Sequence, residues 1–197
     1  ASNRSLLLAP IHLRAQPIGQ NRQVLIRLAA TADLAALVEL AARTFPLACP
    51  PQMPAEDMAA FVAQHLAAKN FEAFFADETA EILVAEAGGN LVGYTLSFDR
   101  EPYDPNIGEL VKNRPTVELS KCYADPTAHG TGIAGQLMAE VLGRATSRGA
   151  KSVWLGVNGM NERAQRFYAK HGFKVIGDRK FVVGDRTEDD LVFEHEL

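Results

Sequence analysis

The order of hydrophobic and polar residues divides the chain into short strands and amphipathic helices. Strict alternation is typical of half-buried strands, whereas apolar residues three and four apart indicate helices. Alternation, together with short apolar runs, predicts strands at residues 23–29, 81–87, 90–98, 116–124, 152–157, 173–176, 180–183 and 190–196. The wider spacing predicts helices at residues 31–45, 55–69, 132–147 and 161–172.

Glycine and proline show how these elements connect. Gly88 and Gly89 predict a hairpin. Prolines at 46, 50, 51 and 54 separate the first two helices, and we expect this connection to form part of a substrate wall; residues 100–115, with three prolines, are expected to be a loop. Because strands and helices mix without regular βα alternation, the pattern favours an α+β fold with a mixed, mostly antiparallel sheet flanked by helices on both faces.

Composition narrows the class of protein. A length of 197 residues with 47% hydrophobic residues suits one domain with a full core, which we assign to residues 23–197, after an N-terminal extension at 1–22 that can be flexible. A net charge of −4 without a Lys/Arg block argues against nucleic-acid binding, and the apolar runs are too short to span a membrane. Two cysteines, Cys49 and Cys122, are too few for a disulfide framework, so we expect reduced thiols and a cytoplasmic location.

The glycine cluster before the third predicted helix is the main candidate binding site. Glycines at a helix start expose backbone N–H groups, and the helix dipole adds partial positive charge, which suits a phosphate. Gly130, Gly132 and Gly135 also satisfy the dinucleotide pattern G-x-G-x-x-G. Its context is wrong, because a five-residue loop precedes Gly130 and no acidic residue lies near Leu155. A third interpretation is that the glycines only permit a tight turn.

Two motifs carry a more specific resemblance. The first is His129-x-x-Gly132-x-Ala134, and the second runs from Asn161 through Ala164, Phe167 and Tyr168 to Gly172-Phe173. Both resemble motifs of the GCN5-related N-acetyltransferase (GNAT) family, R/Q-x-x-G-x-G/A and N-x-x-A-x-x-F/L-Y-x-x-x-G-F. The one departure is His129, which replaces the usual Arg or Gln and removes a fixed positive charge.

The resemblance implies acetyl-CoA as co-substrate, held between two central strands that splay apart. The pantetheine amides would pair with the backbone of Cys122 and Ala124, and an N–H near Tyr123 or Ala124 would face the thioester carbonyl. Asn161 would cap its helix and also contact the cofactor. The diphosphate would lie on the turn that follows His129. The turn residues expected to bind it are Gly130, Thr131, Gly132, Ile133, Ala134 and Gly135.

Two residues are the candidates for proton transfer. Tyr168 resembles the family tyrosine that protonates the leaving thiolate, although packing in the core is the alternative. Glu118 is the candidate base for the amine, because alternation places it on one strand face with Ser120, Cys122 and Ala124; a salt-bridged or solvated Glu118 is the alternative. A thiol nucleophile at Cys122 lacks an evident histidine partner, and the histidines have no metal-ligand spacing, so we expect no metal.

The acceptor is less constrained than the donor. Residues 181–192 resemble the ending of the bacterial spermine/spermidine acetyltransferase branch, and the acidic run Glu188-Asp189-Asp190 would suit a polyamine. That run is also compatible with a hairpin turn. The alternatives are a protein N-terminus, another small amine or peptide, or a non-catalytic acyl-CoA sensor. The resemblance also allows a homodimer.

Overall fold

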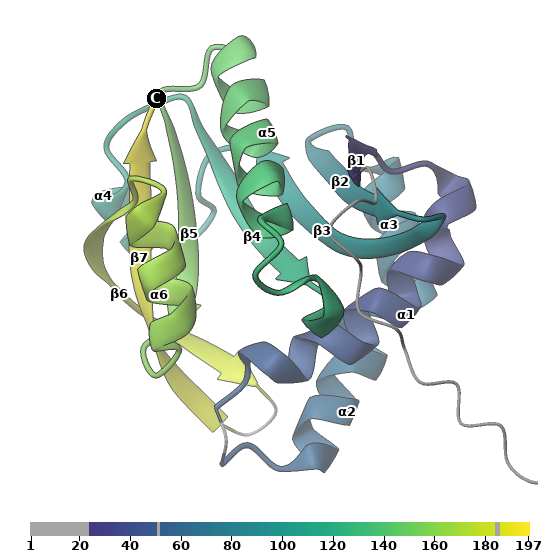
Figure 1. Ribbon diagram of the computed structural model, residues 1–197. Coiled ribbons are helices and arrows are strands. Elements are labelled where there is room, and N and C mark those ends of the chain that lie inside the picture. The colour runs from purple at the N-terminus through teal and green to yellow at the C-terminus, as the bar shows by residue number, and fades with distance from the viewer. Residues whose placement is uncertain (1–23, 51, 184–185) are drawn as a thin grey trace, which may run out of the picture.

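The computed structural model describes residues 24–50, 52–183 and 186–197 (Figure 1). The extension expected at residues 1–22 lies outside the described residues. The strands are β1 (Val24–Leu28), β2 (Ala80–Ala87), β3 (Asn90–Asp99), β4 (Thr116–Ala124), β5 (Ser152–Asn158), β6 (Lys174–Val183) and β7 (Arg186–Glu196). The helices are α1 (Leu34–Thr44), α2 (Ala55–His65), α3 (Ala68–Ala76), α4 (Pro105–Leu110), α5 (Ile133–Ser147) and α6 (Glu162–Lys170). Short 3-10 turns are η1 (Thr31–Asp33), η2 (Phe45–Ala48) and η3 (Pro126–Ala128).

The strands form one seven-stranded sheet in the order β1-β2-β3-β4-β5-β7-β6. Neighbouring strands are antiparallel except for β4 and β5, which run parallel. A parallel pair needs a long crossover, and here α5 provides it. The expected α+β class with a mostly antiparallel sheet is therefore confirmed.

Helices cover both faces of the sheet and pack two large apolar cores, and α4 adds a smaller cluster with Trp154 and Val192. On one face α5 packs Ile133, Leu137 and Met138 against β2–β5, and α6 adds its apolar side to the same core. On the other face α1 and α3 pack Leu37 and Phe71 against β2 and β3. The sheet therefore stands between two apolar layers, and any ligand that reaches its middle must enter between strands or at a strand end.

Such an entry exists between the two parallel strands. β4 and β5 pair only at Thr116–Ser152, Val117–Val153 and Glu118–Trp154. Beyond these positions the strands diverge, and Figure 1 shows the gap widening toward the arrowhead of β4. Because the last six residues of β4 have no strand partner on the β5 side, main-chain groups along that edge can bind a ligand, apart from the Ala124 carbonyl, which is hydrogen-bonded to His129. The splayed central pair expected from the resemblance is confirmed.

Several predicted elements were wrong in detail. The helix expected at 55–69 is two helices, because the chain breaks after His65 and α3 begins at Ala68. The loop expected at 100–115 contains α4, which Asp104 caps by accepting a hydrogen bond from the Asn106 N–H at 2.9 Å. The two strands expected at 173–183 are one strand, β6. The acidic run at 188–190 lies within β7 and not in a turn.

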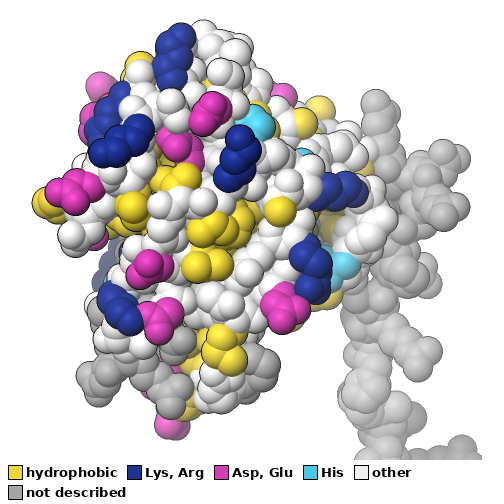
Figure 2. Space-filling model, turned by 90° about the vertical axis from the view of Figure 1, so that its left-hand side faces the viewer, with side chains coloured by type: hydrophobic (Ala, Val, Ile, Leu, Met, Phe, Trp, Pro, Cys, Tyr) yellow, Lys and Arg dark blue, Asp and Glu magenta, His cyan; other side chains and the backbone are white. Residues whose placement is uncertain are grey.

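The outer surface has no field of a single charge sign on the face seen in Figure 2. Apolar side chains gather over the middle of this face, and acidic and basic side chains surround them in alternation. Within the described ranges, no helix combines the length and the apolar character that crossing a bilayer requires.

Candidate active site

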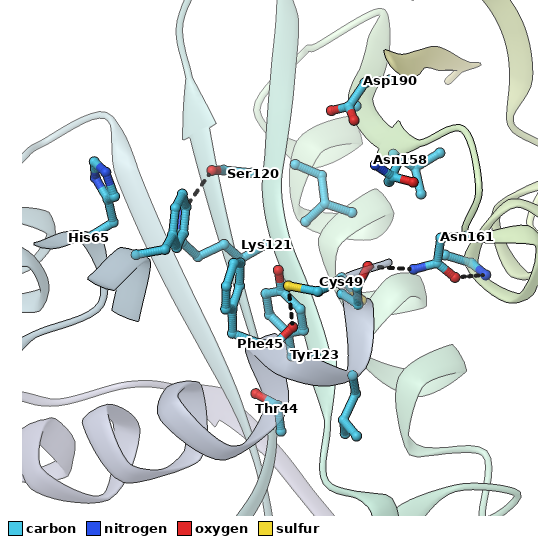
Figure 3. A pocket seen from close by; sticks show the side chains of 18 of the residues that line it. Thr44, Phe45, Cys49, His65, Ser120, Lys121, Tyr123, Asn158, Asn161 and Asp190 are labelled. Atoms are coloured by element: carbon cyan, nitrogen blue, oxygen red, sulfur yellow. Dashed lines mark hydrogen bonds between the residues drawn. The ribbon is translucent and has the colours of Figure 1, made fainter. Parts of the chain in front are cut away.

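A pocket of about 580 Å³ lies where β4 and β5 separate. Its walls come from β4 between Glu118 and Ala124, from the end of β5, and from the segment around η2 that follows α1. Figure 3 shows Asn158, Asn161 and Asp190 on one side and His65 on the other, with Ser120, Lys121 and Tyr123 of β4 between them. The proline-rich connection between α1 and α2 supplies part of the wall, as expected from the sequence.

The N-terminus of α5 lies just beyond the end of β4 and is open. Gly132, its N-cap, has φ 85°, Gly130 has φ 78°, and a Cβ at either position would meet nothing within 4 Å. These conformations favour glycine. Among the described residues no side chain caps this 15-residue helix, so the N–H groups of Ile133, Ala134 and Gly135 lack intrahelical partners. The turn therefore offers donors, positive φ glycines and free space, which fits a diphosphate.

Two of the turn residues have structural roles as well. The Thr131 hydroxyl donates to the Ala128 carbonyl at 2.6 Å, which closes the turn. A Cβ on Gly135 would lie 3.3 Å from Nε2 of His171, so this glycine allows α5 and α6 to approach closely. The packing explanation for Gly135 is therefore as strong as the binding explanation.

His129 joins the turn to α6 through an arginine that the sequence did not point out. Its Nε2 lies 3.2 Å from the Ala124 carbonyl oxygen, and its Nδ1 lies 3.4 Å from Nη1 of Arg163. Because a guanidinium can only donate a hydrogen bond and a carbonyl oxygen can only accept one, Nδ1 of His129 accepts and Nε2 donates. Position 129 thus lacks the fixed positive charge of the motif, but a cation, Arg163, lies beside it and also lines the pocket.

Asn161 caps α6 in the expected way. Its Oδ1 accepts from the Ala164 N–H at 3.0 Å. Its Nδ2 donates to the Ala48 carbonyl at 3.4 Å, which ties α6 to η2 across the opening. The cap accounts for asparagine at this position, and its contact with a cofactor stays a prediction.

Tyr168 lines the pocket from α6 with its ring packed against Phe173 and Phe193. Burial, together with the nearby Cys122 and Tyr123, raises the pKa of Tyr168 well above its usual value of 10. The phenol therefore keeps its proton at neutral pH. Burial also raises the pKa of the Cys122 thiol to about 12, which disfavours the thiolate that a nucleophilic Cys122 would need.

A β-bulge in β4 corrects the expected position of Glu118. Leu96 of β3 pairs with Lys121, but Ser97 pairs with Leu119, so Ser120 is an extra residue. Directly opposed residues share a face of the sheet. The bulge therefore turns Glu118 to the face of α1 and α3, whereas Cys122 packs in the core under α5. The expected common face for Glu118, Ser120, Cys122 and Ala124 was wrong, because an inserted residue changes the phase of alternation.

Glu118 still lines the pocket on the α1–α3 side. Its side chain is 13% exposed, and Oε2 lies 3.7 Å from Nη2 of Arg100. The guanidinium of Arg100 in turn stacks over the Phe98 ring, 4.0 Å from its centroid. Glu118 is thus a carboxylate at the pocket wall with an arginine beside it, which combines the two interpretations considered from the sequence.

The same end of the pocket contains residues that the sequence did not single out. Phe45 and Phe61 stack with ring centroids 4.4 Å apart, and His65 lies against Phe61 at 4.5 Å. Lys121 lies among these aromatic groups, as Figure 3 shows. These residues lie on η2, α2 and β4, and only the fold brings them together. No cluster of three or more potential metal ligands occurs in the part of the chain that the structure describes.

Known proteins resemble this chain over most of its length. A model of the Acetyltransferase (GNAT) family matches residues 34–173. An uncharacterised N-acetyltransferase of Mycobacterium tuberculosis is 45% identical over 165 residues, which cover 84% of this chain and 98% of the relative. The PaiA N-acetyltransferase from Thermoplasma acidophilum, solved in complex with coenzyme A, has a TM-score of 0.71 at 20% identity and covers 89% of this chain and 99% of its own.

A second solved structure is similar to a comparable extent. The putative acetyltransferase yncA from Salmonella typhimurium, solved with acetyl-CoA, has a TM-score of 0.61 at 22% identity, covering 89% of this chain and 94% of its own. The family match and the Mycobacterium relative together identify the class of protein. The chain belongs to the GNAT family of acetyltransferases.

Proposed function

We propose that this protein transfers the acetyl group of acetyl-CoA to a primary amine by direct attack of the amine. The observation that carries the proposal is the order of three features along the chain: the pocket lined by Tyr168 and Glu118, the edge of β4 that does not pair with β5, and the uncapped start of α5 beyond the end of β4. These features suit the thioester, the pantetheine arm and the diphosphate of acetyl-CoA in turn.

Backbone groups of the protein would hold most of the acetyl-CoA molecule. N–H groups from Gly130 to Gly135 would bind the diphosphate, with Arg163 adding positive charge. Cys122 and Ala124 would pair with the pantetheine amides in the manner of an added strand, and an N–H near Tyr123 would stabilise negative charge on the carbonyl oxygen. Bound acetyl-CoA supplies an activated acetyl group and a thiol leaving group.

Two side chains would move protons around the attack. Glu118 accepts a proton from the acceptor ammonium, since only the neutral amine is nucleophilic. Tyr168 then donates a hydrogen bond, and with it a proton, to the sulfur as the C–S bond breaks. The raised pKa of Tyr168 keeps the phenol protonated throughout the neutral pH range, so its O–H is available to donate this hydrogen bond. The same shift makes the phenol a weaker acid, so the proton leaves Tyr168 only as negative charge develops on the sulfur.

A polyamine is a second candidate acceptor, supported by the carboxylates of Glu118 and Asp190 at the pocket wall. Each has an arginine beside it, however, since Arg100 lies 3.7 Å from Glu118 and Arg179 lies 3.4 Å from Asp190. Lys121 adds a further cation. The wall therefore offers a polycation less net attraction than the two carboxylates alone suggest.

Replacement of the Tyr168 hydroxyl tests the proposal. We expect Tyr168→Phe to lower kcat by about 100-fold, a typical loss for a general acid, with little change in acetyl-CoA affinity. Free CoA release should be followed across a panel of polyamines, amino acids and peptides, with calorimetry for donor binding. Tyr94→Phe is the matched control, because this buried phenol lies in the α1–α3 core and outside the pocket.

Three outcomes would separate the alternatives. Absence of acetyl-CoA binding would refute the proposed donor site. Binding without transfer to any amine in the panel would favour an acyl-CoA sensor. Unchanged turnover in Tyr168→Phe would leave the tyrosine only its packing role against Phe173 and Phe193.

A further inference from the structure

The bulge at Ser120 places a lysine in the acceptor end of the pocket. Lys121 pairs with Leu96 and Glu118 with Phe98, and both of these β3 partners belong to the core under α1 and α3. Lys121 therefore points to the same face as Glu118, away from the face of Cys122, which packs under α5. Without the extra residue, position 121 would face α5 instead.

The ammonium of Lys121 has no carboxylate partner among the described residues. None of the ion pairs within 4.0 Å among these residues includes Lys121. The nearest carboxylate on its own strand is that of Glu118, which has Arg100 beside it. Nζ donates to the Ser120 hydroxyl at 3.3 Å and lies 5.5 Å from the centroid of the Phe74 ring. A hydroxyl and an aromatic ring leave most of this partly buried positive charge uncompensated.

The surroundings make this cation costly. Lys121 is partly buried, and the same end of the pocket is lined by the stacked rings of Phe45 and Phe61 and by Leu66 and Phe74. Burial lowers the pKa of Lys121 to about 8, although nearby Glu118 acts in the opposite direction. An ammonium held in a binding pocket at such a cost indicates a ligand that supplies the missing anion.

We propose that Lys121 binds a carboxylate of the acceptor, so that the acceptor is a primary amine that also carries a carboxylate and an apolar group. One ammonium and the Ser120 hydroxyl match the single charge and two oxygens of a carboxylate. The aromatic wall of Phe45, Phe61 and Phe74 accepts the apolar group. A polycation would instead meet like charge at Lys121. Amino acids with apolar side chains have all three features.

That this ligand is the acceptor rests on the proposed acetyl transfer. The test therefore has one arm that measures activity and one that measures binding. In the activity arm, kcat/KM is compared for phenylalanine against 2-phenylethylamine and for leucine against 3-methylbutylamine. We expect wild type to favour each carboxylated amine by at least about tenfold, a typical contribution of a charge-assisted contact. Lys121→Met should remove this preference, and Lys121→Arg should retain part of it.

The binding arm does not depend on turnover. Calorimetry in the presence of CoA compares 3-phenylpropanoate with 3-phenylpropanamide, which differ only in the charged group. Wild type should bind the acid about tenfold more tightly, and Lys121→Met should bind both equally. Lys69→Met is the matched control, because this exposed lysine lies on α3 near the pocket but does not line it.

The outcomes distinguish this inference from the proposed function. Equal binding of acid and amide to wild type, or an equal loss on both amines of a pair in Lys121→Met, would overturn the role of Lys121. An acetyl group on Lys121 itself, detected by intact mass after incubation with acetyl-CoA, would also overturn it. Selective binding of the acid without acetylation of any amine would leave Lys121 as an anion site and refute the transfer.

Discussion

At the scale of single residues, His129 and Arg163 show how a motif's missing charge is replaced. The sequence motif led us to expect a loss at position 129, where histidine stands instead of arginine or glutamine. In the fold, the guanidinium of Arg163 lies 3.4 Å from the His129 ring, at the mouth of the turn where the diphosphate is proposed to bind. A cation from α6, 34 residues away in sequence, therefore lies where the motif would place its charge, and its role in donor binding is a prediction.

Removal of this charge should weaken donor binding more than catalysis. We expect Arg163→Gln to raise the KM for acetyl-CoA by about fivefold, as for one partly exposed charge-assisted contact, with kcat nearly unchanged. The effect should shrink in high salt. Steady-state kinetics at two ionic strengths measures it. Arg166→Gln is the control, since this arginine is 71% exposed and pairs with Glu162 on the outer side of α6; an equal effect there would contradict a local role for Arg163.

The site residues that the sequence did not reveal share one physical reason. Arg163 lies within the second motif, yet its neighbour His129 is known only once α6 packs beside the turn. Lys121 lies in a strand predicted with the correct bounds, but strict alternation placed it on the wrong face, because no residue type signals the bulge. The main-chain part of the site could be predicted from glycine spacing, since glycine is chosen by local geometry. The side-chain part depends on long-range contacts.

At the scale of elements, most strands and helices followed from periodicity, and the exceptions have identifiable causes. The break between α2 and α3 contains no glycine or proline, and it arises because Leu66 and Phe71 both pack into the core against β2 and β3. The start of α4 could have been predicted, since Asp104 followed by Pro105 is a cap signal. Tertiary packing decides the first case, and local chemistry decides the second.

Besides its apolar contacts, α5 is held to the sheet near its C-terminal end by a single carboxylate in β2. Glu81 accepts hydrogen bonds from Arg144 at 2.8 and 2.7 Å and from Arg148 at 2.7 Å, and its side chain is only 11% exposed. Burial opposes ionisation of Glu81, but the two arginines outweigh it and lower its pKa below 4.5. The crosslink spans more than one turn of the helix whose other end forms the proposed diphosphate site.

Loss of this carboxylate should destabilise the protein in a pH-dependent way. We expect Glu81→Gln to lower the free energy of unfolding by about 2 kcal/mol at pH 7, because two arginines lose their partner. Since the folded-state pKa is lowered, the contribution is fully present above about pH 4.5 and is lost as the pH falls below that value. Urea unfolding at a series of pH values from 7 downward measures both. Glu140→Gln, 45% exposed and 3.7 Å from Arg144, should change stability little; a difference between wild type and Glu81→Gln that does not shrink as the pH falls would contradict the electrostatic explanation.

At the scale of the whole molecule, the sheet consists of two halves joined at a short seam. Strands β1–β4 form one half and β5–β7 the other, and only three residue pairs connect β4 with β5. Across the opening, the Asn161–Ala48 hydrogen bond is a further link between α6 and the segment after α1. A ligand that binds along both strand edges would therefore join the halves as well as occupy the pocket.

Donor binding should consequently stabilise the fold at the seam. At about 100 times its Kd, acetyl-CoA should add about 2.7 kcal/mol, which corresponds to a rise in Tm of about 5–10 °C. Hydrogen exchange should show new protection in residues 119–124 of β4 and 155–158 of β5, where β4 and β5 do not pair with each other. The hairpin of β2 and β3, which is paired along its length except at the bulge of Val92, is the internal control. Protection spread evenly over the protein, with none concentrated at the seam, would contradict a ligand between the strands.

The bulge at Ser120 also bears on how such a protein can diverge. Side chains at positions 118, 121 and 123 face the α1–α3 side and its aromatic wall, whereas the donor is proposed to be held largely through peptide groups. Substitutions at these three positions can therefore alter acceptor preference while donor recognition is inherited unchanged. Loss or gain of one residue in this strand would reverse the direction of every side chain beyond it. We therefore expect the length of this strand to be constrained more strongly than the side chains at these three positions.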